Sequence, residues 1–170
     1  MKLYIYHGLD GEIVPKDVTH VIVDNSVTVI KKRAFYECKK HLVSLIMGDN
    51  VKRIEAQAFH YCRALRFIRL SKALEFIGEY AFSHCESLEA LFLPSTVKSI
   101  DWEAFRNCRS LKLLILPHAI DLNNVGKYIM YSGIFQIAKD VGAGYEWNKN
   151  EDGDKNITDE SNRRANEWLI

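Results

Sequence analysis

One short motif recurs at nearly constant spacing and limits what this chain can fold into more than any other feature. The pentapeptide Ala-Phe-x-x-Cys begins at Ala34, Ala58, Ala81 and Ala104, at steps of 24, 23 and 23 residues. A repeat of this length predicts a stack of similar structural units, each of which contacts its neighbours in the sequence.

The motif lies within a longer repeat that shares seven apolar positions. In the unit that begins at Cys85, these positions are Leu88, Leu91, Leu93, Val97, Ile100, Ala104 and Phe105. Apolar residues occupy the same places in the units that begin at Val14, Cys38 and Cys62, and a fifth unit from Cys108 loses the pattern after Ile120. The Leu-x-x-Leu-x-Leu segment predicts a short strand, because residues two apart point to the same face.

The length of the repeat indicates what each unit contains. A period of about 23 residues is too short for two packed helices and fits one coil with a strand and a tighter return segment. A single coil cannot bury its apolar face, so the coils must stack and each repeated position becomes a ladder through the core. The predicted fold is a mainly β solenoid of about five stacked coils with parallel strands and a short, partly helical C-terminal tail.

The repeat resembles that of BspA-type leucine-rich repeat proteins, Cys-x-x-Leu-x-x-Ile-x-Leu-Pro-x-x-Leu-x-x-Ile-Gly-x-x-Ala-Phe-x-x-Cys. Pro94 and Pro117 fall at the family proline, and Gly78 falls at the family glycine. The opening segment "GEIVPKDVTHVIVDNSVTVI" is similar to the N-terminal entry of intracellular-looking protist members of this group. The resemblance covers roughly residues 14–120, and it implies a leucine-rich-repeat solenoid and protein–protein recognition.

The repeat boundaries divide the chain into three parts. We place the solenoid at residues 1–120, with repeats at about 14–37, 38–61, 62–84 and 85–107 and a partial repeat at 108–120. Residues 121–147 are rich in aromatic and aliphatic side chains and are expected to cap the last coil, since a stack must cover its exposed end; a partner-binding helix is the alternative. Residues 148–170 are expected to form a polar loop and a short terminal helix.

All four cysteines share one repeat position: Cys38, Cys62, Cys85 and Cys108. We expect a column of buried, reduced thiols at a tight bend, because cysteine is small and frequently buried. A zinc site requires ligands that converge, and thiols in line on successive coils do not. Disulfides between adjacent coils have a suitable separation, but parallel side chains and a reducing compartment argue against them. A catalytic thiol needs a paired histidine, and His60 and His84 occupy other repeat positions.

The outward residues of the predicted strands form two columns on one surface. One column contains His20, Ser44, Phe67, Ala90 and Leu113, and the other contains Ile22, Ile46, Arg69, Phe92 and Ile115. A contiguous exposed apolar surface usually marks an interface, and aromatic residues and arginine are common anchors there. We therefore predict a protein-binding site at Ile22, Ile46, Phe67, Arg69, Phe92, Leu113 and Ile115. Cover by the C-terminal tail or by a second copy of the chain remains open.

Composition and motifs argue against several classes of function. The net charge is +1, which gives no bulk electrostatic case for binding nucleic acid or an anionic membrane. No apolar run reaches the ~18 residues of a membrane span. Nucleotide-binding, hydrolase and metalloprotease motifs do not occur in the sequence, so we expect no enzyme activity, no cofactor and no metal.

A non-catalytic scaffold for protein–protein interaction is therefore the predicted function, and the partner is a protein of unknown identity. The alternative is a self-associating structural module or a fragment of a larger repeat protein. The N-terminal segment turns polar at Asp10, too early for the ~7–15 apolar residues of a secretory signal, so a cytoplasmic location is expected.

Overall fold

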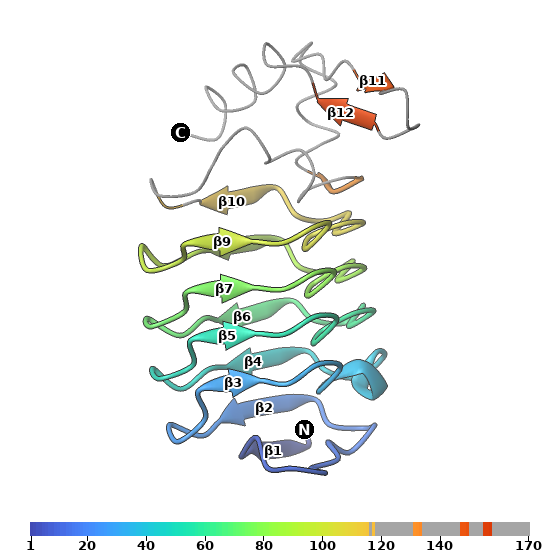
Figure 1. The fold of residues 1–170 in the computed structure, drawn as a ribbon. Helices are drawn as coiled ribbons and strands as arrows, with labels where there is room; N and C mark the ends of the chain where they lie inside the picture. Colours follow the sequence, from blue (N-terminus) through green and yellow to red (C-terminus); the bar gives the residue numbers. More distant parts are fainter. Residues whose placement is uncertain (116, 118–130, 134–146, 150–154, 158–170) are drawn as a thin grey trace.

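The structure is a computed structural model that describes residues 1–115, 117, 131–133, 147–149 and 155–157. The repeats form coils that are stacked along a nearly straight axis, and each complete coil carries two short strands (Figure 1). The first strands of successive coils are β2 (His20–Val23), β4 (Ser44–Ile46), β6 (Phe67–Arg69), β8 (Ala90–Phe92) and β10 (Leu113–Ile115). The second strands are β3 (Val29–Ile30), β5 (Arg53–Ile54), β7 (Phe76–Ile77) and β9 (Ser99–Ile100).

The second strands pair into a continuous parallel sheet, the return sheet, in the order β3-β5-β7-β9. The first strands pair in parallel as β1-β2-β4-β6 and as β8-β10, and together we call them the long-strand sheet. Within residues 1–115, β6 and β8 form no ladder, although β7 and β9 of the same two coils do pair. The repeat therefore continues through this local break. The predicted parallel solenoid is confirmed, with a second strand in what the sequence indicates only as a return segment.

An additional strand, β1 (Leu3–Tyr6), precedes the first repeat and pairs in parallel with β2. The sequence does not predict it, because this segment lacks the repeat motif and shows only the alternation Leu-Tyr-Ile-Tyr. Tyr6 is buried, and its ring centroid lies 5.1 Å from that of Phe35. The N-terminal end of the hydrophobic core is thus covered by β1 itself.

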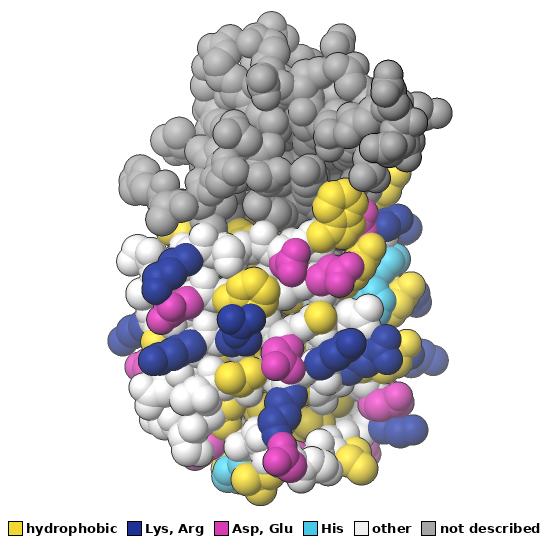
Figure 2. All heavy atoms as spheres, viewed as in Figure 1, with side chains coloured by type: hydrophobic (Ala, Val, Ile, Leu, Met, Phe, Trp, Pro, Cys, Tyr) yellow, Lys and Arg dark blue, Asp and Glu magenta, His cyan; other side chains and the backbone are white. Residues whose placement is uncertain are grey.

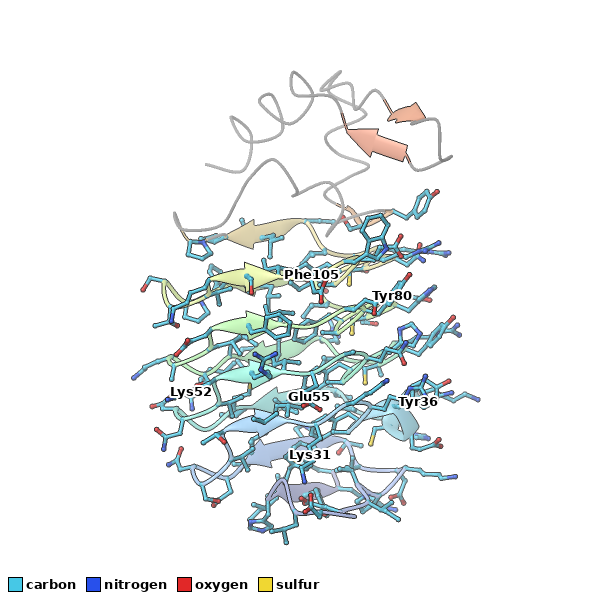
Figure 3. All side chains as sticks on the ribbon, viewed as in Figure 1. Lys31, Tyr36, Lys52, Glu55, Tyr80 and Phe105 are labelled. Carbon is cyan, nitrogen blue, oxygen red and sulfur yellow. The ribbon has the colours of Figure 1, made fainter. Side chains whose placement is uncertain are left out.

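The core between the two sheets is built from ladders of equivalent residues. Phenylalanine forms the most regular of them, with ring centroids 4.9 Å apart for Phe35–Phe59, 5.0 Å for Phe59–Phe82 and 5.6 Å for Phe82–Phe105. These rings are fully buried and nearly parallel, at interplanar angles of 3–12°. Figure 3 labels the last ring, Phe105. The ring spacing is close to the ~4.8 Å distance between neighbouring strands, so stacking of coils and stacking of rings reinforce each other.

The turns that carry Ala-Phe-x-x-Cys have an unusual backbone. The residue before each Ala-Phe has a positive φ, and so does the residue before each cysteine of the later coils: Arg33, Gln57, Tyr61, Tyr80, His84, Glu103 and Asn107, at 50–62°. This conformation costs roughly 1–2 kcal/mol in a non-glycine residue. In return, alternate amides donate to the next coil, as from Gln57 to Glu79 O at 2.9 Å and from Phe59 to Ala81 O at 2.8 Å. Because this hydrogen-bonding pattern recurs from coil to coil, the strain has a structural role.

The C-terminal part is described only in short pieces. Gly133 donates its amide to the Cys108 carbonyl at 3.0 Å, which ties residues 131–133 to the fifth coil. Strands β11 (Trp147–Lys149) and β12 (Lys155–Ile157) pair antiparallel, where the sequence predicts a polar loop. The rest of the predicted cap at 121–147, and the predicted helix near the C-terminus, lie outside the described residues.

Candidate functional site

Each strand of the long-strand sheet has one buried and one exposed face. The inward residues of the central strands, such as Leu45, Ile68 and Leu91, are at most 8% exposed. The outward apolar residues predicted from the sequence are 39–61% exposed: Ile22, Ile46, Phe67, Phe92, Leu113 and Ile115. Alternation along a strand explains the difference, because neighbouring side chains point to opposite faces. The inward residues therefore build the core, and the outward residues are available for contacts at the surface.

β1 extends this surface by one more coil. Leu3 and Ile5 are 55% and 48% exposed and lie in register with His20 and Ile22 of β2. The sequence reasoning missed both residues, since they precede the first repeat; the alternation in residues 3–6 is the signal that could have found them. We call the outward residues of the six strands the strand face: Leu3, Ile5, His20, Ile22, Ser44, Ile46, Phe67, Arg69, Ala90, Phe92, Leu113 and Ile115.

The charges at the centre of the strand face are paired within the chain. Arg69 Nη1 lies 3.2 Å from Asp49 Oδ1, and Arg69 Nη2 donates to the Met47 carbonyl at 2.7 Å. At its edges, Lys72 also contacts Asp49, at 3.7 Å, and Arg66 Nη2 lies 3.3 Å from Glu89 Oε1. The strand face is thus apolar and close to electrically neutral, and Arg69 contributes its flat guanidinium rather than an uncompensated charge.

The face formed by the return sheet has a different character. Figure 2 shows basic and acidic side chains interspersed over it. Lys98 Nζ lies 2.6 Å from Glu75 Oε2 on the neighbouring coil, and the Arg53 guanidinium lies 4.2 Å from the ring centroid of Phe76. This pairing between coils follows the alternation of charge at Lys52, Glu75 and Lys98 in the sequence, and it is typical of a solvated surface.

The four cysteines are free and fully buried, in one column at the turn (Figure 3). Each thiol donates a weak hydrogen bond to a carbonyl of the preceding coil. The Sγ–O distances are 3.4 Å from Cys62 to Phe35, 3.3 Å from Cys85 to Phe59 and 3.1 Å from Cys108 to Phe82. The position requires a small side chain that fits the buried turn and a donor for the carbonyl of the preceding coil. Cysteine supplies both, which explains its recurrence.

Burial also makes these thiols unreactive. Desolvation raises the pKa of Cys38 and of Cys108 to about 12, and it raises the pKa of Cys62 and Cys85 as well. Since the thiolate is the reactive species, we expect a thiol-specific probe to modify the native protein at neutral pH far more slowly than the unfolded protein. Timed labelling followed by mass spectrometry measures this difference. Fast modification of two or more cysteines in the native protein would contradict it.

Two histidines meet on the outer side of the turns, near Tyr36 and Tyr80, which Figure 3 labels. The ring centroid of His60 lies 5.8 Å from that of His84 and 6.1 Å from that of Tyr36. The sequence places the two histidines at different repeat positions and gives no reason to pair them. They come together because coil stacking brings the residue two before Cys62 beside the residue just before Cys85.

Burial makes the protonated form of His60 unfavourable. Desolvation, together with the nearby His84 and Arg33, lowers the pKa of His60 from 6.5 to about 4. Desolvation lowers the pKa of His84 too. His60 Nδ1 is buried and has no hydrogen-bond partner. A backbone hydrogen bond at Ser83 favours the protonated ring but offsets only part of the lowering of its pKa.

We therefore expect the protein to lose stability as the pH falls below about 6.5. Between pH 6.5 and 4 the unfolded chain binds a proton at residue 60 that the folded chain does not, which favours unfolding. The full shift corresponds to roughly 3 kcal/mol, and we expect about 1–2 kcal/mol because the ring is only partly buried. Urea denaturation at pH 7.5 and 4.5 measures the loss. The His60→Gln variant should lose less; an equal loss would contradict this assignment.

The described part of the chain shows neither a cluster of metal ligands nor a membrane-spanning helix. No group of three or more His, Cys, Asp or Glu residues there is placed to hold a metal ion. None of the helices in that part is long and apolar enough to cross a membrane.

Several solved structures share this architecture. A leucine rich cell surface protein from Faecalibacterium prausnitzii has a TM-score of 0.63 at 26% identity, over 71% of this chain and 32% of that one. The T. pallidum leucine rich repeat protein has a TM-score of 0.61 at 24% identity, over 83% and 77% of the two chains, and its likeness concerns the fold alone. A leucine-rich repeat protein from Bacteroides capillosus has a TM-score of 0.52 at 28% identity, over 56% and 75%. The chain spans about a third of the length of the F. prausnitzii protein.

The repeat itself identifies the family. No curated protein matches the sequence significantly. The model of the BspA type leucine rich repeat region matches residues 15–134 in six copies, and so it continues past Ile120, where the apolar pattern weakens. The match covers most of the chain and includes every repeat whose strands the structure describes, and the chain belongs to the BspA-type leucine-rich repeat family.

Proposed function

We propose that this protein is a non-catalytic recognition module that binds another protein chain through its strand face. A leucine-rich repeat fold is commonly a protein-interaction module, and this general property is the starting point. A stack of coils presents its outward residues as one extended surface, which suits contact with a large partner. No group of residues on the described surface suggests a reaction as the alternative.

One observation carries the proposal. Eight large apolar side chains of the strand face are 39–61% exposed and lie on the two ladders, β1-β2-β4-β6 and β8-β10, of the long-strand sheet: Leu3, Ile5, Ile22, Ile46, Phe67, Phe92, Leu113 and Ile115. A free aromatic side chain presents roughly 150–250 Å² and a free Leu or Ile side chain somewhat less, so half-exposure of two aromatic and six aliphatic side chains amounts to roughly 700–800 Å². The largest apolar patch on a typical monomer is about 300–600 Å², and larger patches mark interaction sites.

The proposal is tested with two double variants, each of which replaces two exposed side chains by serine. The strand-face variant is Phe67→Ser with Phe92→Ser. The return-face variant, Lys52→Ser with Lys98→Ser, alters the outer face of the return sheet. All four side chains are exposed, so both variants should fold. Immobilised wild-type protein and the return-face variant should retain the same proteins from a lysate of the native cells, and the strand-face variant should retain at least ~10-fold less. Equal retention by the strand-face variant would place binding elsewhere.

The proposal extends to the location of the protein, which we place in a reducing compartment, with the cytoplasm favoured. Four free thiols within one chain support this placement, because oxidising compartments favour disulfides. One structural relative is described as a cell surface protein, so the location requires direct measurement. Cell fractionation should find the chain with cytoplasmic markers, and recovery with the cell surface would contradict this part of the proposal.

A further inference from the structure

The strand face is suited to a particular partner, and this inference rests on the proposed function. We propose that the strand face binds a second copy of the same chain, which gives a symmetric dimer with the two long-strand sheets packed face to face. Sheets packed in this way lie ~10 Å apart and interlock the side chains of their facing surfaces.

The size of the surface meets what a stable dimer needs. The exposed apolar area of roughly 700–800 Å² is close to the area that each partner contributes to an interface of standard size. Figure 1 shows the coils stacked along a nearly straight axis, so the strand face offers one extended surface to a matching copy. A face of this extent left in water would also favour non-specific association.

The charges favour a copy of this chain over a charged partner. Arg69 and Lys72 both contact Asp49, and Arg66 contacts Glu89, so no basic residue at the centre of the face lacks an acidic neighbour. When two copies meet, a charged face would oppose like charge and be repelled, whereas a neutral apolar face is self-compatible. A dimer with twofold symmetry requires this self-complementarity.

The two outward columns also complement each other in size. A twofold axis parallel to the stack places each coil against the same coil of the copy and exchanges the columns. Phe92 then opposes Ala90 of the copy, and Ile46 opposes Ser44, so a large side chain faces a small one in both coils. Phe67 opposes Arg69, whose planar guanidinium is suited to stack on an aromatic ring.

The remaining outward positions fit this arrangement. Leu3 opposes Ile5, and Leu113 opposes Ile115, all of them apolar. His20 opposes Ile22. One ring nitrogen of His20 is 2.8 Å from Thr19 Oγ1, so this nitrogen keeps a hydrogen-bond partner when the ring enters the interface. No outward residue of the six strands is left facing an incompatible one.

Sedimentation velocity on the full chain tests the proposal. Over a concentration series around 1 µM, the wild type should convert from monomer to dimer with a dissociation constant in roughly the micromolar range. Phe92→Glu should weaken the dimer by at least ~30-fold, because a charge would be buried in the interface. The control Thr28→Glu adds the same charge at an exposed position next to β3 of the return sheet and should leave the dimer unchanged.

A second pair of variants tests the position of the axis. Ser44→Lys and Ile46→Glu should each be monomeric, and a mixture of the two should form a heterodimer, since residue 44 of one copy meets residue 46 of the other. A mixture that stays monomeric would overturn this arrangement. Unfolding midpoints of all variants establish that each one is folded.

Failure of this inference is distinguishable from failure of the proposed function. A wild type that stays monomeric up to about 100 µM overturns the second-copy proposal, and so does a Phe92→Glu variant that remains dimeric. If the wild type is monomeric but the Phe67→Ser, Phe92→Ser variant no longer retains the proteins that the wild type retains from the lysate, the proposed function stands without the dimer. If the wild type is monomeric and that variant retains all of these proteins, both proposals are wrong.

Discussion

Replacement of Phe59 by alanine should lower the free energy of unfolding by about 3–5 kcal/mol, the largest effect that we expect from any single substitution. Phe59 is fully buried, and its ring lies between those of Phe35 and Phe82, at centroid distances of 4.9 and 5.0 Å. The substitution leaves a cavity in the middle of the ladder and removes two stacking contacts, each worth roughly 0.5–1.5 kcal/mol. Urea denaturation of the purified variant measures the loss.

The matched control is the same substitution at Phe67. This ring is 56% exposed on the strand face and forms no part of the core. Phe67→Ala should therefore change the free energy of unfolding of the monomer, measured well below about 1 µM, by less than about 1 kcal/mol. A loss at Phe67 as large as that at Phe59 would show that its ring is buried in the folded protein, and the strand face could then not be a free binding surface.

Replacement of Gly133 by valine should lower the free energy of unfolding by about 1–3 kcal/mol. A Cβ atom at Gly133 would lie 2.5 Å from the Arg109 carbonyl oxygen and 2.6 Å from that of Leu111. Both atoms belong to the backbone of the fifth coil and cannot move without disturbing it. The larger side chain must therefore displace residues 131–133 from the coil and break the hydrogen bond from Gly133 to Cys108.

Ser95→Val serves as the control, because Ser95 is exposed in a turn and tolerates a larger side chain. It should change stability by less than about 0.5 kcal/mol. If Gly133→Val were equally harmless, residues 131–133 would not be docked on the fifth coil. The predicted role of residues 121–147 as a cap would then lose the support that it has from residues 131–133.

The repeat made most of this fold predictable. Once Leu45, Leu91 and their equivalents are recognised as inward, alternation along the strand makes their neighbours outward in every coil. For this reason, the exposure of residues as far apart as Ile22 and Ile115 follows from one pattern. The Ala-Phe-x-x-Cys spacing likewise predicts the buried ladders at the turns, because equivalent residues of stacked coils must lie side by side.

Features that depart from the repeat could not be predicted from the repeat pattern. β1 has no motif, and its place is decided by pairing with β2 and by burial of Tyr6. The break between β6 and β8 has no counterpart in the sequence, since both repeats are of normal length. The contact of Arg69 with Asp49 joins two coils at different repeat positions, and so a comparison of equivalent positions does not reveal it.

Photo-crosslinking from the centre of the strand face tests the central claim most directly. A benzophenone side chain introduced at Phe67, between Ser44 and Ala90 in its column, is compared in cells with the same group at Lys52 on the return sheet. We expect irradiation to join position 67 to a protein of defined mass and to give little product from position 52. If position 67 gives no product, or if position 52 gives the same product with equal yield, the strand face is not the recognition surface.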